Sequence, residues 1–148
     1  MLNQYVVFQL EDELYGVNIL QVRGIEKMLP LTRVPNAPPF VKGVCNLRGS
    51  VIPVIDLKKK LGLPQKEDPN AKIIVVNVGK HTVGMTIDEA ADVVTLDASE
   101  VEPSPSLVAG IDAEYISGVA KVHNRLLIIL DMERILTADQ INLLNELR

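Results

Sequence analysis

Two copies of one β-rich pattern make up most of the 148-residue chain, and this repeat constrains the fold more than any other feature. Residues 5–28 align without a gap with residues 73–96, at an offset of 68 residues. Residues 40–61 align with residues 115–136 at an offset of 75, again without a gap. Apolar residues keep their places in both blocks, which indicates an internal duplication with a longer middle loop in the second copy.

Each copy predicts five short strands. A first strand meets a polar turn, a second strand follows, and a longer bent strand leads into a proline-containing loop and a hairpin. The clearest predicted strands are 6–10, 22–28, 43–47 and 51–55 in the first copy, and 73–78, 90–96, 118–122 and 126–130 in the second. Short strands separated by turn signals at close intervals predict an all-β fold of two small closed barrels.

The hairpin turns of the two copies match chemically. Arg48-Gly49 in the first copy corresponds to His123-Asn124 in the second. Gly and Asn are the residues that best tolerate the positive φ of a tight hairpin turn. We therefore expect the same turn in both copies, carrying an arginine in only one.

Capping residues predict short helices after both hairpins. Asp56 and Asp131 each follow a hairpin strand, where a carboxylate would accept hydrogen bonds from a helix N-terminus. Gly62 is expected to end the first of these helices. A C-terminal helix is predicted over residues 137–147, with Thr137 and Gln140 forming a capping box.

The chain is expected to form a single unit over residues 1–148. Approximate sub-barrels cover 5–61 and 73–136, and a polar linker with prolines covers 62–72. A chain of this length buries roughly 70% of its unfolded surface, so it folds without disulfides. The single cysteine, Cys45, stands in an apolar run and is interpreted as a small core residue.

Charge and hydropathy exclude two classes of partner. The net charge of −4 argues against nucleic acid, whose phosphates require clustered Lys and Arg. The one basic cluster, Lys58 to Lys60, is interpreted as a solvated helix face. We read no signal peptide at the N-terminus, and the longest apolar run, residues 126–130, is too short to span a bilayer. The sequence therefore predicts a cytosolic protein without direct membrane insertion.

No pattern of catalytic or metal-binding residues stands out. His81 and His123 fall at predicted turns and lack partners at metal-ligand spacing, so no metal site and no cofactor are expected. Asp88 and Glu89 are adjacent acids, and a small hydrolase using them in a pocket between the barrels is kept as a minor alternative.

Two features point instead to a contact surface. Residues 29–40, LPLTRVPNAPPF, form an apolar loop with four prolines, which either packs beneath another element or is offered to a partner. Arg48 lies at a hairpin tip between Leu47 and Gly49, where its guanidinium could bind a partner's carboxylate or carbonyl.

The run NLRGSVIPVIDL at residues 46–57, with VPNAPPFVKGV directly before it, closely resembles the signature of the CheW family of bacterial chemotaxis. The opening strands and residues 73–93 also resemble this family, so the resemblance covers nearly the whole chain. It implies two SH3-like five-stranded barrels around a shared hydrophobic core, with short helices and a C-terminal helix. The family's barrels are intertwined, which leaves open which strands belong to which barrel.

The resemblance implies a non-enzymatic adaptor without a cofactor. Its expected partners are the cytoplasmic tip of chemoreceptors and the regulatory domain of the histidine kinase CheA, in arrays beneath the membrane. The alternative within this class is a scaffold of a related pathway such as surface motility.

Site residues also follow from the resemblance. Val22, Gly24 and Arg48 match receptor-binding positions, although Gly24 stands where the family often has Glu, and Glu26 is nearby. Leu31, Val34 and Phe40 are our expectation for the kinase-binding face.

Overall fold

The computed structural model describes residues 1–64, 66, 68–103, 107–108, 111–137 and 140–141. Strands dominate this part of the chain, as the repeat predicted. The strands are β1 (Leu2–Leu10), β2 (Glu13–Asn18), β3 (Val22–Lys27), β4 (Val41–Leu47), β5 (Ser50–Asp56), β6 (Lys72–Val78), β7 (His81–Ile87), β8 (Glu89–Asp97), β9 (Leu107–Val108), β10 (Ile111–Asp112), β11 (Ile116–Val122) and β12 (Arg125–Leu130). The helices are α1 (Leu57–Leu61) and the 3-10 turns η1 (Ile19–Gln21), η2 (Ala98–Glu100) and η3 (Ala113–Tyr115).

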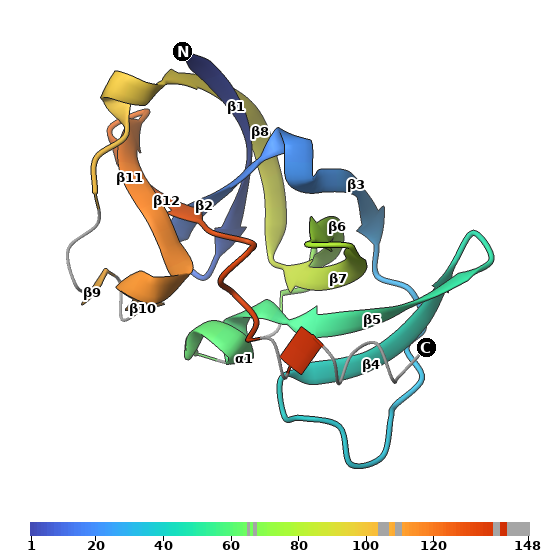
Figure 1. Ribbon diagram of the computed structural model, residues 1–148. Helices are drawn as coiled ribbons and strands as arrows, with labels where there is room; N and C mark the ends of the chain where they lie inside the picture. The colour runs from blue at the N-terminus through green and yellow to red at the C-terminus, as the bar shows by residue number, and fades with distance from the viewer. Residues whose placement is uncertain (65, 67, 104–106, 109–110, 138–139, 142–148) are drawn as a thin grey trace.

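Two five-stranded sheets form the body of the molecule, and each curls upon itself into a barrel (Figure 1). The first barrel has the strand order β11-β12-β2-β1-β8, and the second has the order β3-β6-β7-β5-β4. Each barrel therefore takes strands from both halves of the sequence. The chain passes from the first barrel to the second through η1, and it returns where β7 meets β8.

The predicted hairpins are confirmed. β4 pairs with β5 up to Leu47↔Ser50, and β11 pairs with β12 up to Val122↔Arg125. Arg48 and Gly49 have φ values of 50° and 87°, while His123 and Asn124 have 52° and 61°. Both turns thus use positive φ at two successive residues, which matches the twist of the flanking strands.

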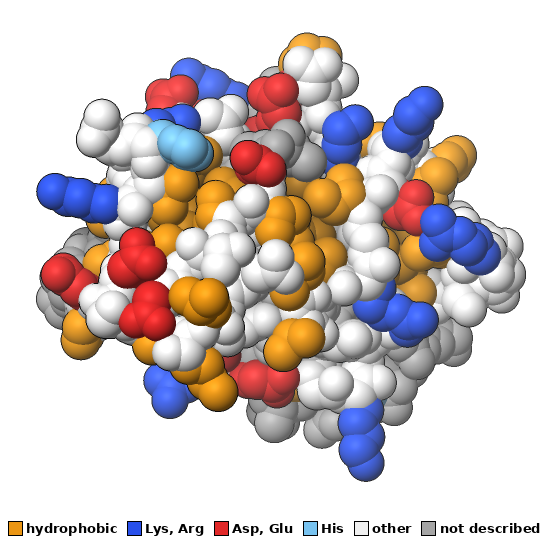
Figure 2. Space-filling view, turned by 90° about the horizontal axis from the view of Figure 1, so that it is seen from above, with side chains coloured by type: hydrophobic (Ala, Val, Ile, Leu, Met, Phe, Trp, Pro, Cys, Tyr) orange, Lys and Arg blue, Asp and Glu red, His pale blue; other side chains and the backbone are white. Residues whose placement is uncertain are grey.

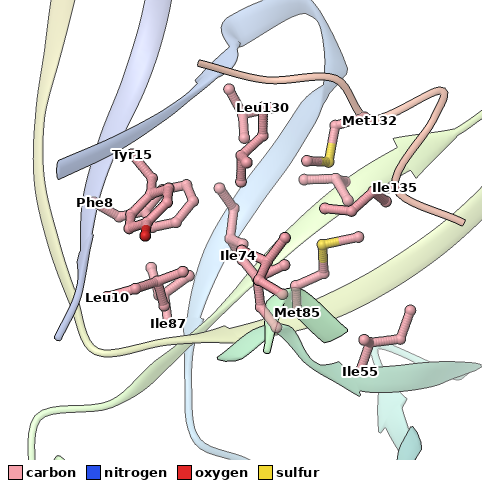
Figure 3. Close-up of a cluster of buried hydrophobic side chains, with 14 of the residues drawn as sticks. Phe8, Leu10, Tyr15, Ile55, Ile74, Met85, Ile87, Leu130, Met132 and Ile135 are labelled. Carbon is pink, nitrogen blue, oxygen red and sulfur yellow. The ribbon is translucent and has the colours of Figure 1, made fainter. Parts of the chain in front are cut away.

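One shared core lies between the barrels, and each barrel has a further core of its own. Successive side chains of a strand point to opposite faces, so one strand can serve two cores. On β6, Ile74 and Val76 face the shared core, whereas Ile73 and Val75 face the interior of the second barrel. Figure 3 shows side chains of both barrels, among them Phe8 and Met85, pointing toward one another in the shared core.

A close backbone approach clamps the proline-rich loop to the edge strand β4. Thr32 and Val44 exchange two backbone hydrogen bonds of 2.9 Å each. A Cβ atom at Gly43 would stand 2.4 Å from the carbonyl oxygen of Thr32, so only glycine fits there. The second copy repeats the clamp, because Glu102 bridges Val119 beside Gly118.

The predicted caps are confirmed around α1 and only in part elsewhere. Asp56 accepts a hydrogen bond from the Lys59 backbone N–H at 3.1 Å, and Gly62 ends the helix with φ 74°. Asp131 accepts from the Glu133 N–H at 3.0 Å, but turns and bends follow it, so the prediction of a second helix there is wrong.

Thr137 and Gln140 exchange the two hydrogen bonds of the predicted capping box, at 3.0 and 3.2 Å. Ile141 packs against the shared core, and the rest of the predicted C-terminal helix lies outside the described residues. Within the described part of the chain, no helix has the length and apolar character needed to cross a membrane.

The interpretation of Lys58 to Lys60 as a solvated face is wrong for Lys58. Its side chain is only 9% exposed and forms ion pairs with Glu11 and Asp88. Because α1 packs against β7, the Lys58 side chain points into the junction between the barrels. Lys59 is exposed, as expected.

Candidate functional site

A surface hollow of about 530 Å³ opens on the second barrel, between the edge strand β3 and the β4–β5 hairpin. β3 and β4 are the two outer strands of this sheet, so the hollow lies where the barrel is not closed by backbone pairing. It is lined by Arg23, Gly24, Glu26, Leu47, Arg48, Ser50, Val51, Ile52, Val75 and Thr82. The structure therefore brings together Gly24 and Arg48, two of the three residues expected to contact a receptor.

An ion pair spans the hollow. Arg48 Nη2 donates to Glu26 Oε1 at 2.6 Å, from the hairpin tip to β3. The Arg48 side chain remains 77% exposed, whereas that of Glu26 is 21% exposed. Glu26 thus anchors the guanidinium at the rim, because an ion pair orients the long arginine side chain while its remaining N–H groups stay available as donors.

Gly24 leaves open space beside this pair. A Cβ atom added at Gly24 would meet no described atom within 4 Å. Val51, also in the lining, is 46% exposed. The hollow therefore combines an oriented cation, a carboxylate and an apolar wall around an unfilled space, which suits an inserted partner side chain.

Val22 lies on the other face of β3, which simple alternation along the strand does not predict. Val22 pairs with Val76, while Gly24 pairs with Val75, so the register shifts between them. Such a bulge changes the face to which the following side chains point. Val22 is half-buried against the shared core, whereas Gly24 and Glu26 line the hollow. The bulge therefore separates Val22 from the other two expected receptor contacts.

The proline-rich loop both packs on the barrel and presents a surface. Leu31 is half-buried against the core of the second barrel. Phe40 is 8% exposed and belongs to the shared core, with Lys60 Nζ 5.4 Å from its ring centroid. Val34 lines a second hollow of about 500 Å³, formed mainly by this loop. Among the three residues expected to bind the kinase, Val34 therefore lines a surface hollow, whereas Phe40 lies in the shared core and fixes the end of the loop there.

The upper face of the molecule mixes apolar and charged side chains. Seen from the top of Figure 1, hydrophobic side chains gather across the middle of the surface, and Lys, Arg, Asp and Glu side chains lie toward its rim (Figure 2). Over the described surface as a whole, large apolar residues such as Leu20, Ile25 and Val93 are exposed by 84%, 37% and 46%. Apolar surface with a polar rim is typical of protein–protein contact sites.

The described residues contain no cluster of three or more side chains able to hold a metal ion. Asp88, the acid considered for a hydrolase, is buried and uses both carboxylate oxygens in contacts with Lys58 and the Glu11 backbone N–H. Glu89 is exposed. This arrangement gives Asp88 the surroundings of a structural carboxylate.

Two intertwined barrels, a shared core and open hollows on the surface define a small protein built on SH3-like barrels. A family model, the CheW-like domain, matches residues 4–140, and the chain belongs to the CheW family of chemotaxis proteins.

Curated relatives agree with this assignment. The chain is 36% identical to the chemotaxis protein CheW of Klebsiella aerogenes, over 96% of this chain and 86% of the relative. It is 41% identical to the CheW of Bacillus subtilis, over 88% of this chain and 85% of the relative. The crystal structure of the scaffolding protein TtCheW from Thermoanaerobacter tengcongensis matches with a TM-score of 0.86 at 34% identity, covering 95% of this chain and 91% of that chain.

Proposed function

We propose that the protein is a non-enzymatic adaptor that couples chemoreceptors to the histidine kinase CheA. Family membership supports a role in chemotaxis, and the hollow that carries Arg48 is the observation that best supports a partner-binding role. The adaptor would act in the cytoplasm and be recruited to receptor arrays at the membrane.

The receptor would bind at the hollow of the second barrel. A receptor helix would place an apolar side chain over Gly24 and Val51 and offer an acceptor to the free N–H groups of Arg48. Glu26 would take the polar role of the acid that is missing at Gly24, because it holds Arg48 at 2.6 Å. Val22 would contribute from the adjoining face of β3, near the junction of the barrels.

The kinase would bind the proline-rich loop. Leu31 and Val34 are half-buried, and the loop is fixed by the Thr32–Val44 bridge from one side and by Phe40 in the core. A loop that is already ordered loses little conformational entropy on binding. Its Leu31 and Val34 side chains would meet apolar groups of the CheA regulatory domain.

Arg48→Ala tests the proposal. The receptor cytoplasmic fragment, CheA and the adaptor would be co-sedimented, and kinase activity would be measured with and without the adaptor. We expect Arg48→Ala to abolish receptor control of the kinase, with a free energy of unfolding within about 1 kcal/mol of the unmodified protein, since exposed ion pairs contribute little.

Arg134→Ala is the matched control, because Arg134 is also exposed and ion-paired, with Asp131 at 3.5 Å. It should leave receptor control unchanged. Normal control by Arg48→Ala would remove the hollow from the receptor site, and an unmodified protein that fails to join receptor and kinase would refute the adaptor function itself. Coupling only to the receptor and kinase of a motility system would favour the related-pathway alternative.

A further inference from the structure

Three charged side chains meet at the junction of the barrels. Lys58 Nζ lies 2.6 Å from Asp88 Oδ1 and 3.0 Å from Glu11 Oε1. The side chains of Lys58 and Asp88 are each 9% exposed, and that of Glu11 is 20% exposed. Lys58 also donates to the backbone carbonyl of Lys66. This cluster belongs neither to the hollow nor to the proline-rich loop.

The cluster joins three elements at the point where the chain changes barrels. Glu11 lies in the turn between β1 and β2 of the first barrel, and Lys58 lies in α1, which follows β5 of the second. Asp88 is the single residue between β7 of the second barrel and β8 of the first. Its Oδ2 accepts from the Glu11 N–H at 2.6 Å, and its own N–H donates to the Gln9 carbonyl at 3.0 Å.

Buried charges of this kind resist separation. Moving α1 away from Asp88 would leave carboxylates in a low-dielectric junction without their cation, and a buried charge without a partner is strongly unfavourable. Burial alone would lower the pKa of Lys58, but the hydrogen bonds from its ammonium to Asp88 and Glu11 outweigh burial and raise it. Lys58 therefore stays charged, and the β7–β8 crossing is held from both barrels.

Among the described residues, the other crossing has no such cluster. In the repeat, Leu20 of η1 aligns with Asp88, Gly79 with Glu11, and Glu133 with Lys58. Leu20 is 84% exposed, and the one side-chain bond found between η1 and residue 133 runs from Gln21 Nε2 to Glu133 Oε1 at 3.4 Å, in the described part of the chain. Two crossings that are equivalent by the repeat thus differ. The β7–β8 crossing is buried and ionic, whereas at Ile19–Gln21 the Leu20 side chain is exposed and Ile19 packs, partly buried, against the shared core.

We propose that Lys58, Asp88 and Glu11 form an ionic lock that fixes the angle between the two barrels at the β7–β8 crossing, a restraint that the opposite crossing, Ile19–Gln21, does not share. Asp88 is the central residue of this lock, because it contacts Lys58 and the Glu11 and Gln9 backbone. The lock adds to the shared hydrophobic core a directional restraint on how the two barrels meet.

Spin-label distances in the full chain test this lock. Nitroxides would be attached at Lys42→Cys on β4 and Ser117→Cys on β11, which are exposed and equivalent in the repeat. The buried Cys45 would be replaced by alanine, the residue at its counterpart Ala120. Pulsed electron spin resonance then gives the distribution of distances between the barrels, and hydrogen exchange reports the opening of each crossing.

The deciding variant combines Lys58→Met, Asp88→Asn and Glu11→Gln, which removes all charges at nearly constant volume. We expect its distance distribution to be roughly twofold broader, and the Asp88 and Glu89 amides to exchange at least about tenfold faster than in the unmodified protein. Lys58→Met alone is expected to lose more stability, because it leaves both carboxylates without a cation. If it does not fold, the triple variant still decides.

Gln21→Ala is the matched control at the opposite crossing, and it should leave the distance distribution unchanged. Unchanged width and unchanged protection at residues 88–89 in the triple variant would overturn the lock. Equal protection of the two crossings in the unmodified protein would also overturn it, because the lock is expected to hold the β7–β8 crossing more firmly than Ile19–Gln21.

Discussion

Gly43→Ala is the substitution whose effect the structure determines most directly. The added Cβ would stand 2.4 Å from the Thr32 carbonyl oxygen, 3.1 Å from its carbonyl carbon and 3.5 Å from Leu31 Cβ. The loop would have to move by roughly 1 Å to restore ordinary contact distances. Because the contact is with backbone rather than with the end of a flexible side chain, the strain cannot be relieved by a rotamer change.

The cost follows from what this movement breaks. Two backbone hydrogen bonds of 2.9 Å join Thr32 and Val44, and each contributes about 0.5–1.5 kcal/mol. Overpacking a well-packed site adds about 1–3 kcal/mol. We therefore expect Gly43→Ala to lower the free energy of unfolding by about 2–6 kcal/mol.

Urea denaturation measures this loss, with Gly24→Ala as the control. A Cβ at Gly24 meets no described atom within 4 Å, so alanine there should leave stability unchanged or raise it by about 0.5 kcal/mol. On the proposed function, a folded Gly43→Ala protein should bind CheA more weakly and bind receptor normally. A stability within about 0.5 kcal/mol of Gly24→Ala would refute the clamp.

Two further predictions concern Tyr15 and alkaline pH. The Tyr15 hydroxyl is buried and has no hydrogen-bond partner among the described residues, so Tyr15→Phe should stabilise the protein by about 1 kcal/mol in thermal or urea unfolding, and a loss of stability would show that the hydroxyl is bonded. Burial raises the pKa of Tyr15, and the pKa of Lys58 is raised by its carboxylate partners. Both groups hold their protons more tightly when folded, so their titration leaves the free energy of unfolding unchanged below about pH 10. Above this pH their titration lowers it, by up to about 1.4 kcal/mol per pH unit for each group. Urea denaturation between pH 8 and 12 measures this loss, whose slope should be shallower in Tyr15→Phe, and a flat profile would contradict it.

The part of the candidate site that could be read from the local sequence is the hairpin turn at residues 48–49. Gly49, like its counterpart Asn124, tolerates positive φ and predicts this turn, and the structure has it as expected, with Arg48 also at positive φ. The Arg48–Glu26 pair joins residues 22 positions apart, and no local pattern indicates it. The β3 bulge that turns Val22 away from Gly24 also escaped prediction, since it interrupts the two-residue alternation on which strand faces are assigned.

The sequence by itself determined the elements of this protein. Apolar runs such as Ile73–Val76 predict strands buried on both faces, the repeat doubles them, and turn and cap residues set most of their ends. Only the tertiary structure decided how the elements combine. The alternation of side chains along a strand does not show which sheet the strand joins. Only the folded structure shows that β3 joins the second barrel and β8 the first, in the arrangement that fills the shared core.

The same holds for Lys58. Three consecutive lysines on a short helix indicate a solvated face. The carboxylates that pair with the buried Lys58 come from residues 11 and 88, which are distant from it in the sequence. An ion pair between such distant positions depends on where the folded barrels place α1, because attraction between charges acts through space and leaves no periodic trace in the sequence.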